Sequence, residues 1–324
     1  MLKIGSIELS VPFLQAPLSG YSDYAMRRLA RDFGAPLTFL GVMLAKSAAN
    51  VKVLKKDIFI PREDEHPIGA QILGREPEVM AAGAKCLEGA GYDLIDLNFA
   101  CPAPKVLARG RGGYLINEPE KALEIYRSVR AAVKCPVTAK LRIGYDGSAE
   151  SRENFWEIAE CLSAEGIDAI AIHGRYVKQR FRDASDWAIL TEAKERLGGT
   201  TIIGSGDLLD AESAAKALSD SGVDGVLIAR GAIGNPWIFR ELRSILEGGE
   251  KCGEPSITEQ GEVILRHFEL VSELYDDGKA VRYMRKFLVH YCRRHVERKR
   301  VQASMLEAEN GEELSAAIKR WYCL

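Results

Sequence analysis

Short apolar runs recur along roughly the first 230 residues of the chain, and stretches of mixed polarity separate them. Eight of these runs predict β-strands: Phe13–Ala16, Leu37–Leu40, Ile68–Gln71, Leu94–Asn98, Val137–Lys140, Ala169–His173, Ile202–Gly204 and Gly225–Ile228. Apolar residues recur at helical spacing in the intervening stretches Glu78–Gly89, Pro119–Val133, Glu153–Glu165 and Ala211–Ser219. Strands that alternate with helices indicate parallel strands joined by crossover helices. Eight such units predict an α/β fold of the (β/α)8 TIM-barrel type.

The pattern changes after Trp237, where the strand-like runs end. The segment Glu241–Glu247 completes a helix, and Gly248–Pro255 has the composition of a linker. Helical periodicity predicts three further helices, at Glu259–Tyr275, Ala280–Cys292 and Gly311–Trp321. The sequence therefore predicts two domains, a TIM barrel over residues 1–248 and a small all-α domain over residues 249–324.

The composition is that of an ordinary globular protein, since 47% of the 324 residues are hydrophobic and 28% are charged. No apolar stretch approaches the roughly 20 residues that a membrane helix needs, and the amino terminus lacks the pattern of a secretory signal. We therefore expect a cytoplasmic protein that does not bind a membrane. The seven cysteines include no Cys-x-x-Cys pair, so we expect reduced thiols rather than disulfides or a zinc ribbon.

Polar residues close four of the predicted strands, and glycine-containing turns follow two more: Gln71, Asn98, Lys140, His173, 204–207 and 229–231. The carboxyl ends of the strands carry the chemistry in TIM barrels, so these features fall where an active site is expected. A single polar strand end is usually structural. Six together favour a functional site.

Two of these features favour a phosphorylated cofactor. The turns Gly204–Asp207 and Ala229–Gly231 offer backbone N–H groups where barrels commonly bind phosphate, with Arg230 beside them. The positive charge of Lys140 could stabilise negative charge on a reduced cofactor ring. Gln71 offers a hydrogen-bond donor and an acceptor to the imide edge of a flavin. Both roles point to flavin mononucleotide (FMN). The alternatives are an ion pair for Lys140 and a core amide bonded to backbone for Gln71.

Cys101 lies in the loop after the fourth strand, which reads Asn98-Phe-Ala-Cys101-Pro-Ala-Pro-Lys105-Val. An unperturbed thiol is mostly protonated at neutral pH, so a cysteine there is able to give a proton to a substrate carbon. The alternative is a thiolate nucleophile, which needs a basic partner, and His173 is the only histidine of the predicted site. We interpret Cys101 as a general acid.

The formal net charge of −2 does not by itself favour a nucleic-acid partner, but the charge is unevenly distributed. Nine Lys and Arg residues lie between Lys279 and Arg300, with Glu297 as the only acid. We expect these cations on one basic helix, where they would contact the phosphate backbone of a nucleic acid. The alternative is an ordinary solvated helix face.

Several segments resemble motifs of the tRNA-dihydrouridine synthases, in the family's order and over nearly the whole chain. The most specific is Asn98-x-x-Cys101-Pro-x-x-Lys105-Val, which is similar to the family's signature. The other matching segments are Gln15–Asp23, Ala139–Gly144, His173–Arg175, Ala184–Trp187, Gly204–Asp207, Gly222–Phe239 and Val281–Lys286. Three residues depart from the family pattern, in which Gly is usual at Ala100, Asn at Ser205 and Thr at Tyr176.

The resemblance implies an enzyme that reduces the C5–C6 double bond of a uridine in tRNA to 5,6-dihydrouridine. It implies NADPH or NADH as the reductant, FMN as the cofactor and Cys101 as the acid that protonates C5. The residues expected to bind FMN are Ala16, Pro17, Leu18, Gln71, Lys140, His173, Ser205, Gly206, Asp207, Ala229 and Arg230. The residues expected to contact tRNA are Asn98, Lys105, Arg142, Arg175, Arg282, Arg285, Lys286, Arg293 and Arg294. We expect a monomer.

Three other functions agree less well with the sequence. A flavin barrel that reduces a free pyrimidine or a small enone would have no use for the clustered cations. An RNA-binding barrel without catalysis would have no need of Gln71, Cys101, Lys140 and His173 together. Metal catalysis would need ligands such as His290-x-Cys292-x-x-His295, but packing and charge explain that spacing better, so no metal is expected.

Overall fold

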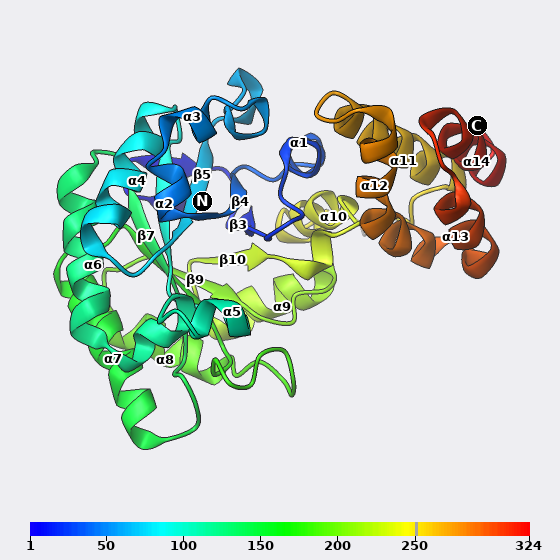
Figure 1. The fold of residues 1–324 in the computed structure, drawn as a ribbon. Coiled ribbons are helices and arrows are strands. Elements are labelled where there is room, and N and C mark those ends of the chain that lie inside the picture. The colour runs from blue at the N-terminus through cyan, green and yellow to red at the C-terminus, as the bar shows by residue number, and fades with distance from the viewer. Residues whose placement is uncertain (250–251) are drawn as a thin grey trace.

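In the computed structural model, which describes residues 1–249 and 252–324, the chain forms a barrel followed by a helical region (Figure 1). The barrel strands are β3 (Phe13–Gln15), β4 (Thr38–Leu44), β5 (Ile68–Leu73), β6 (Leu94–Asn98), β7 (Val137–Arg142), β8 (Ala169–His173), β9 (Ile202–Ser205) and β10 (Gly225–Ile228). They pair in the order β3-β10-β9-β8-β7-β6-β5-β4, and all pairs are parallel. The Gln15 amide donates to the Leu37 carbonyl over 3.1 Å between the two ends of the sheet, so the barrel is nearly closed. The predicted (β/α)8 fold is confirmed.

The strands form because their side chains are buried on both faces of the sheet, as is usual for parallel strands. Every residue of β5 and β7 is buried. Inside the barrel, one apolar cluster includes Leu14, Phe39, Leu94, Ala171 and Leu227. A larger apolar cluster fills the space between the strands and the surrounding helices. The polar strand ends therefore stand above a packed core and not above a channel.

A hairpin of β1 (Leu2–Ile4) and β2 (Ile7–Leu9) precedes the barrel and was not predicted, because strands of three residues are too short to show alternation. Leu2, Ile4 and Leu9 join the cluster inside the barrel. Thr201, directly before β9, donates its hydroxyl to the Lys3 carbonyl over 2.9 Å. The hairpin therefore covers the amino-terminal end of the barrel and leaves the carboxyl ends of the strands accessible.

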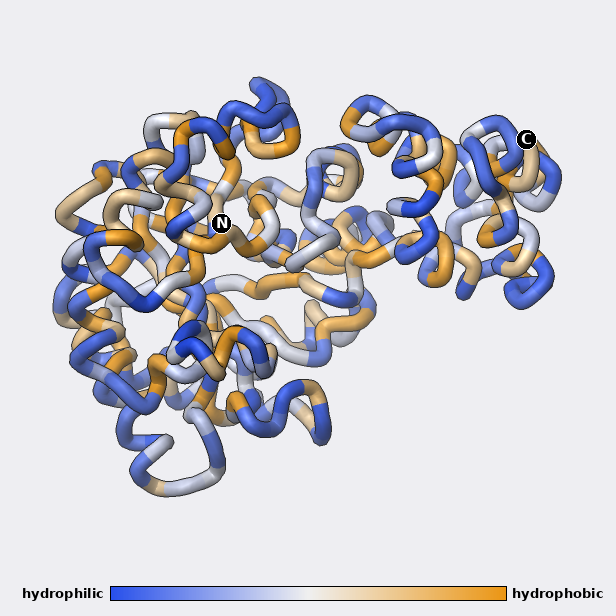
Figure 2. The backbone as a smooth tube through the Cα atoms, viewed as in Figure 1, coloured by the Kyte–Doolittle hydropathy of each residue, from blue (hydrophilic) through white to orange (hydrophobic). Residues whose placement is uncertain are grey.

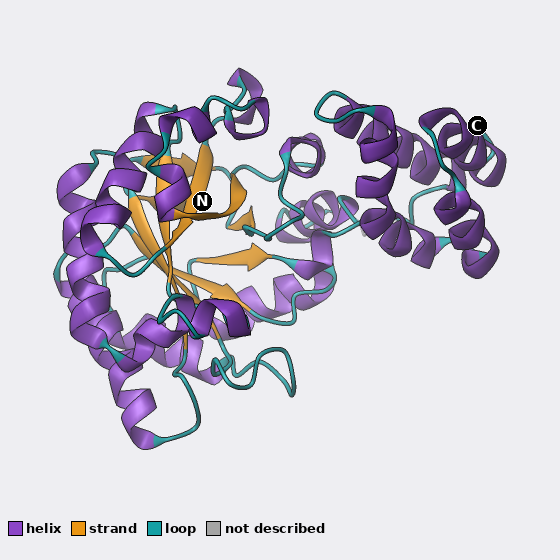
Figure 3. Cartoon of the chain, in the orientation of Figure 1, coloured by secondary structure: helices purple, strands orange, loops and turns teal. Residues whose placement is uncertain are grey.

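Helices surround the barrel (Figure 3). They are α1 (Tyr24–Asp32), α4 (Pro77–Gly89), α6 (Pro119–Ala132), α7 (Ala149–Ala164), α8 (Ala188–Arg196), α9 (Ala211–Ser221) and α10 (Trp237–Leu246), with the short helices α2 (Ala45–Ala48), α3 (Val51–Leu54) and α5 (Pro104–Leu107) in loops. Capping explains why α7 begins before the predicted Glu153, since the Ser148 hydroxyl accepts a hydrogen bond from the Ser151 amide. No helix in the described ranges combines the length and apolar character that crossing a bilayer requires.

The helical region consists of α11 (Ile257–Ser272), α12 (Asp277–Tyr291), α13 (Arg298–Glu307) and α14 (Gly311–Tyr322). Hydrophilic and hydrophobic positions alternate around these helices, as expected when one face of each is buried (Figure 2). The region lies beside α1 and α10 of the barrel, and α1 packs against α11. The predicted linker Gly248–Pro255 falls between α10 and α11, and its residues 250 and 251 lie outside the described residues.

The basic segment from Lys279 to Arg300 is not a single helix, and that prediction is wrong. The helix α12 ends at Tyr291, a 3₁₀ turn follows at Cys292–Arg294, and α13 begins at Arg298. The turn forms because Cys292 is buried in the helical core and its carbonyl accepts a 3.1 Å hydrogen bond from the His295 amide. The nine cations are therefore divided among three elements.

Candidate active site

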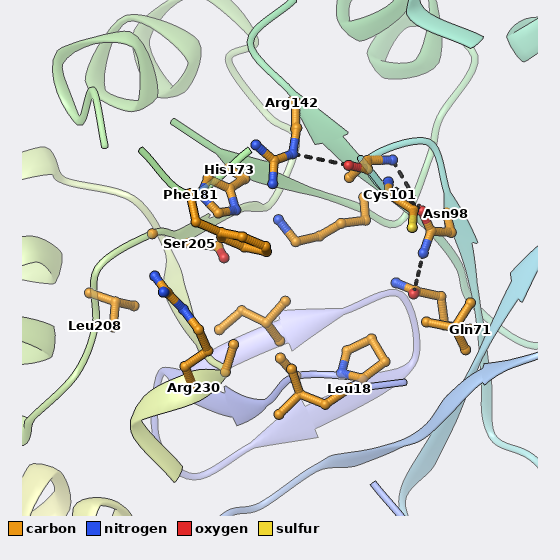
Figure 4. A pocket seen from close by; sticks show the side chains of 18 of the residues that line it. Leu18, Gln71, Asn98, Cys101, Arg142, His173, Phe181, Ser205, Leu208 and Arg230 are labelled. Atoms are coloured by element: carbon orange, nitrogen blue, oxygen red, sulfur yellow. Dashed lines mark hydrogen bonds between the residues drawn. The ribbon is translucent and has the colours of Figure 1, made fainter. Parts of the chain in front are cut away.

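A cavity of about 250 Å³ lies at the carboxyl ends of the barrel strands (Figure 4). This volume is slightly below the roughly 300–1,000 Å³ usual for small-molecule sites. All eleven residues predicted to bind FMN line it: Ala16, Pro17, Leu18, Gln71, Lys140, His173, Ser205, Gly206, Asp207, Ala229 and Arg230. Asn98, Cys101 and Arg142 line it as well. The fold thus brings to one place side chains that are far apart in the sequence.

A chain of buried hydrogen bonds crosses three neighbouring strands below the cavity. Thr138 Oγ1 and Gln71 Nε2 each donate to the Asp96 carboxylate over 2.6 Å. Gln71 Oε1 accepts a 2.6 Å hydrogen bond from Asn98 Nδ2. Burial raises the pKa of Asp96 above its ordinary value, and the bonds from Gln71 and Thr138 oppose that rise. The Gln71 amide is therefore fixed by side chains in one orientation, and it retains a second N–H and a second lone pair for a ligand.

Asn98 also fixes the loop that carries Cys101. Its Oδ1 atom accepts hydrogen bonds from the amides of Ala100 and Cys101, over 3.1 and 2.9 Å. From the opposite side, Arg142 Nε donates to the Ala100 carbonyl over 3.0 Å. Cys101 is half-buried and lines the cavity (Figure 4).

A glycine that was not singled out from the sequence closes this loop from behind. Gly112 has a φ of +59°, and a Cβ atom there would lie 3.0 Å from the Cβ atom of Cys101 and 2.9 Å from the Val106 side chain. A residue with a side chain would be strained in that conformation and crowded against the loop, so glycine is required. The available signal was the pair Gly112-Gly113 shortly after the candidate catalytic residues.

Lys140 is a buried cation that lines the cavity. Its Nζ atom has no hydrogen-bond or ion-pair partner among the described residues, so the ion pair considered from the sequence is not formed. Burial lowers the pKa of Lys140 to about 7, and the neighbouring Arg142 adds to that effect while Asp96 opposes it. An unpartnered buried ammonium group favours a ligand that carries or develops negative charge.

His173 and Arg175 form a second polar group at the end of β8. Arg175 Nη1 lies 3.2 Å from His173 Nε2, and since an arginine only donates, that ring nitrogen is the acceptor. Burial, together with the cations Lys140, Arg142, Arg175 and Arg230, lowers the pKa of His173 far below its ordinary value. His173 is thus neutral and makes no hydrogen bond to Cys101 in the described part of the chain, which disfavours a thiolate–imidazolium pair.

Arg175 itself lies outside the cavity lining, in contrast to Arg142. Its guanidinium is buried, pairs with the Asp207 carboxylate over 2.5 Å and donates to the Asp183 carbonyl over 2.6 Å. Arg142 donates to the carbonyls of Tyr176 and Arg180 over 3.0 and 2.7 Å. The two arginines therefore hold the backbone of the loop between β8 and α8 from below.

That loop carries Phe181, a lining residue that was missed from the sequence. Its ring is 54% exposed and lies 4.9 Å from the Arg230 guanidinium and 5.5 Å from that of Arg142, with the His173 ring at 6.4 Å (Figure 4). A large apolar ring left half exposed beside a polar cavity indicates a surface for a flat ligand. The signal in the sequence was an aromatic residue between Arg180 and Arg182, following a candidate strand end.

The turns after β9 and β10 face the same cavity. The backbone amides of Gly206, Asp207 and Arg230 donate to no protein acceptor in the described ranges. The Asp207 carboxylate pairs with Arg175, which lowers the pKa of Asp207 against the effect of burial. Arg230 is 43% exposed in its side chain and lies 3.5 Å from Asp207. Free amides next to an accessible arginine are suited to a phosphate group.

The remaining cations predicted to contact tRNA lie outside the cavity. Lys105 on α5, Arg282 on α12 and Arg293 in the 3₁₀ turn are exposed. Arg285 donates to the Ala308 carbonyl over 3.3 Å, and Arg294 to Asn235 Oδ1 over 2.9 Å and to the Glu254 carboxylate. Lys286 contacts the barrel.

His295, one of the residues considered as metal ligands, has other partners. His295 Nε2 lies 3.0 Å from the Trp321 carbonyl, and its Nδ1 accepts from the Glu297 amide over 3.0 Å. In the part of the chain that the structure describes, no three His, Cys, Asp or Glu side chains are grouped so as to hold a metal ion.

Comparison with known proteins gives a consistent result. The family model described as Dihydrouridine synthase matches residues 14–320. A probable tRNA-dihydrouridine synthase from Rickettsia conorii is 37% identical over 294 residues, which cover 90% of this chain and 87% of the relative. The tRNA-dihydrouridine synthase B of Pasteurella multocida is 34% identical over 291 residues, with 90% and 86% covered.

Solved structures of similar fold include histamine dehydrogenase from Rhizobium sp. 4-9, at a TM-score of 0.57 and 16% identity, and morphinone reductase, at 0.53 and 14%. The similarity covers 83% of this chain and 50% of histamine dehydrogenase, and 79% of this chain and 90% of morphinone reductase. At such identities the likeness shows the fold alone.

Proposed function

This chain belongs to the dihydrouridine synthase family, and on that basis we propose that it is an FMN-dependent oxidoreductase acting on tRNA. The proposed reaction reduces the C5–C6 double bond of one uridine to 5,6-dihydrouridine, with NADPH or NADH as the source of electrons. The observation that carries the proposal is that Cys101 and the unpartnered ammonium group of Lys140 line the same cavity.

The residues of the cavity fit FMN in three respects. Gln71 is fixed in orientation with a donor and an acceptor remaining, which suits the imide edge of an isoalloxazine ring. Lys140 offers a positive charge without a protein partner. The free amides of Gly206, Asp207 and Arg230, with the Arg230 guanidinium, would hold the phosphate group.

The chain's own contribution to the reaction is proton delivery and charge stabilisation. When bound, reduced FMN would supply the hydride that C6 of the uracil ring gains. The Cys101 thiol gives its proton to C5, and the resulting thiolate regains a proton from water. Lys140 stabilises negative charge in the cavity, and Asn98 holds the Cys101 loop at the required distance.

We propose that tRNA binds across the barrel rim and the helical region. The exposed cations Lys105, Arg282 and Arg293 support this, since they are available to phosphates and lie on both parts of the chain. The corresponding division is a catalytic domain over residues 1–248 and a tRNA-binding domain over residues 249–324. A cytoplasmic monomer remains our prediction for compartment and oligomeric state.

The test is reduction of a tRNA that lacks dihydrouridine. Purified protein is incubated with FMN, NADPH and this tRNA, and mass mapping locates any uridine that has gained two hydrogens. We expect a gain at a defined position, and the loss of dihydrouridine from the same position when the gene is deleted. Reduction of free uridine or a small enone without reduction of tRNA would favour the alternative enzyme, and absence of flavin binding would refute the proposal.

A further inference from the structure

A group of aromatic and charged side chains joins α12 to the loop between β3 and α1. Lys286 of α12 donates from Nζ to the backbone carbonyl of Gly20 in that loop. The same ammonium group lies 3.1 Å from the ring centroid of Tyr283 and 5.2 Å from that of Tyr21. Tyr21 in turn meets the Phe287 ring edge to face at 5.4 Å. One of the contacts between the helical region and the barrel is therefore a cation that is surrounded by aromatic rings.

The contacted loop is part of the cavity wall. Leu18 and Ser19, directly before Gly20, both line the cavity. The loop is internally braced, because the Leu18 amide donates to Ser22 Oγ over 2.8 Å and the Tyr21 amide donates to the Leu18 carbonyl over 3.0 Å. A displacement at Gly20 is thus passed to the residues that face the ligand.

Gly20 is suited to this contact by its backbone. Its φ is +77°, a conformation that residues with side chains rarely adopt, and it turns the chain at the tip of the loop where Lys286 reaches its carbonyl. No atom lies within 4 Å of the position a Cβ atom would take, so conformation and not crowding is what favours glycine here.

Lys286 differs in its surroundings from a cation that binds phosphate. It is half-buried, and the half-buried Asp23 carboxylate also faces it from the start of α1. Asp23 is held in place by the Met26 amide, over 3.0 Å. Arg282, one turn earlier on α12, is exposed instead. One helix therefore presents one cation to the barrel and another to solvent.

We propose that Lys286 is a positioning residue that fixes the Gly20 loop, and with it Leu18 and Ser19, for cofactor binding, instead of contacting a tRNA phosphate. The inference rests on the proposed function only in taking the cavity to be the FMN site. This positioning role replaces the tRNA contact expected for Lys286 from the sequence. The helical region would then support the wall of the cofactor site.

The test compares Lys286→Met with the matched variant Arg282→Met. Flavin fluorescence measures FMN affinity, and tRNA binding is titrated at several salt concentrations. Lys286→Met should weaken FMN binding by about tenfold and leave the salt slope of tRNA binding unchanged, whereas Arg282→Met should lower that slope by about one and leave FMN affinity unchanged. A salt slope lowered by about one in Lys286→Met, with normal FMN affinity, would overturn the proposal.

A variant on the barrel side keeps the test decisive if Lys286→Met folds poorly. Tyr21→Leu removes an aromatic face without changing any charge, so it should weaken FMN binding at an unchanged salt slope. In the double variant the two losses should be less than additive, because they remove one contact, and full additivity would contradict the proposal. Hydrogen exchange of residues 16–23 should accelerate in Lys286→Met even without flavin, which separates failure of this inference from failure of the proposed function.

Discussion

The side-chain amide of Asn98 donates a 2.6 Å hydrogen bond to Gln71 Oε1, while its own oxygen accepts from the loop that carries Cys101. One side chain therefore joins Gln71, proposed to bind the edge of a flat cofactor, to the loop of Cys101, proposed to give a proton. Since Asn98 and Gln71 are both buried on neighbouring strands, the relation between the two walls of the cavity is set by the barrel itself.

This relation predicts the effect of Asn98→Ala. The substitution leaves Gln71 Oε1 and two loop amides without their partner, and each unsatisfied buried group costs about 1–3 kcal/mol. We expect the variant to be less stable in urea, to retain FMN and to reduce tRNA at least about tenfold more slowly than the wild type. Asn98→Asp is the comparison variant, because it keeps the acceptor for the loop amides but replaces the donor to Gln71 with a buried carboxyl oxygen. Wild-type turnover in both variants would contradict this role.

Cys101→Ala tests the proposed acid directly. Removing the thiol should lower the rate of tRNA reduction by about 10²- to 10⁴-fold, the usual contribution of a general acid. FMN content and its reduction by NADPH should not change, because the cavity residues assigned to the cofactor are untouched. Stopped-flow absorbance separates the two half-reactions. Normal reduction of tRNA by Cys101→Ala would remove Cys101 from the mechanism.

The barrel and the residues that line its cavity could be predicted because the strands are short apolar runs, four of which end in a polar residue. Gln71, Lys140 and His173 are recognisable in that way, and the (β/α)8 topology alone brings them to one end of the barrel. What topology does not determine is how a long loop folds back. Phe181 reaches the cavity only because buried arginines hold the carbonyls of its loop, and no local pattern encodes that support.

In the helical region, too, the sequence pattern predicts the elements better than their tertiary contacts. Three of the four helices described there were predicted and α13 was missed. Charge alone could not distinguish Lys286, which is half-buried against the barrel, from the exposed Arg282. The helix end near Cys292 was predicted, but the cations beyond it were still assigned to the same basic helix, because the residues that follow have ordinary helix propensity and tertiary burial of Cys292 decides the turn.

Arg293 and Arg294 are neighbours in sequence, and we expect different effects from neutralising them. Arg293 is exposed, so Arg293→Ala should weaken tRNA binding and lower its salt slope by about one, with little effect on stability. Arg294 pairs with Glu254 and Asn235, so Arg294→Ala should lower the melting temperature as well. Oxidation of NADPH by the bound flavin should persist in both. An unchanged tRNA affinity in Arg293→Ala would exclude this turn from the RNA surface.

Phe181→Ala should impair substrate reduction without destabilising the fold. Since the ring is 54% exposed, its removal creates no core cavity, and the free energy of unfolding should change by less than about 0.5 kcal/mol. Loss of an aromatic surface for a flat ring should lower kcat/KM for tRNA by about tenfold. Phe181→Tyr keeps the ring and should retain most of the activity. Equal losses in both variants would show that the aromatic face is not what matters.

The lowered pKa of Lys140 predicts how the free energy of unfolding depends on pH. In the flavin-free protein the pKa of Lys140 is lowered to about 7 from an ordinary 10.5, so between these values the unfolded chain binds more protons than the folded one. The free energy of unfolding should therefore rise with pH across this window and level off above it. His173 contributes nothing there, because its pKa is lowered from 6.5 and both states are neutral at higher pH.

Urea unfolding of the wild type and of Lys140→Met at several pH values from about 7 to about 9 isolates this effect. The variant lacks the titrating group, so the difference in unfolding free energy, wild type minus variant, should increase by on the order of 1 kcal/mol per pH unit. Saturating FMN should reduce the increase, because a ligand that favours the ammonium form restores the proton affinity of Lys140. If the difference in unfolding free energy between the flavin-free proteins did not change with pH, Lys140 would have its ordinary pKa. The proposal that its buried side chain favours a negatively charged ligand would then lose this support.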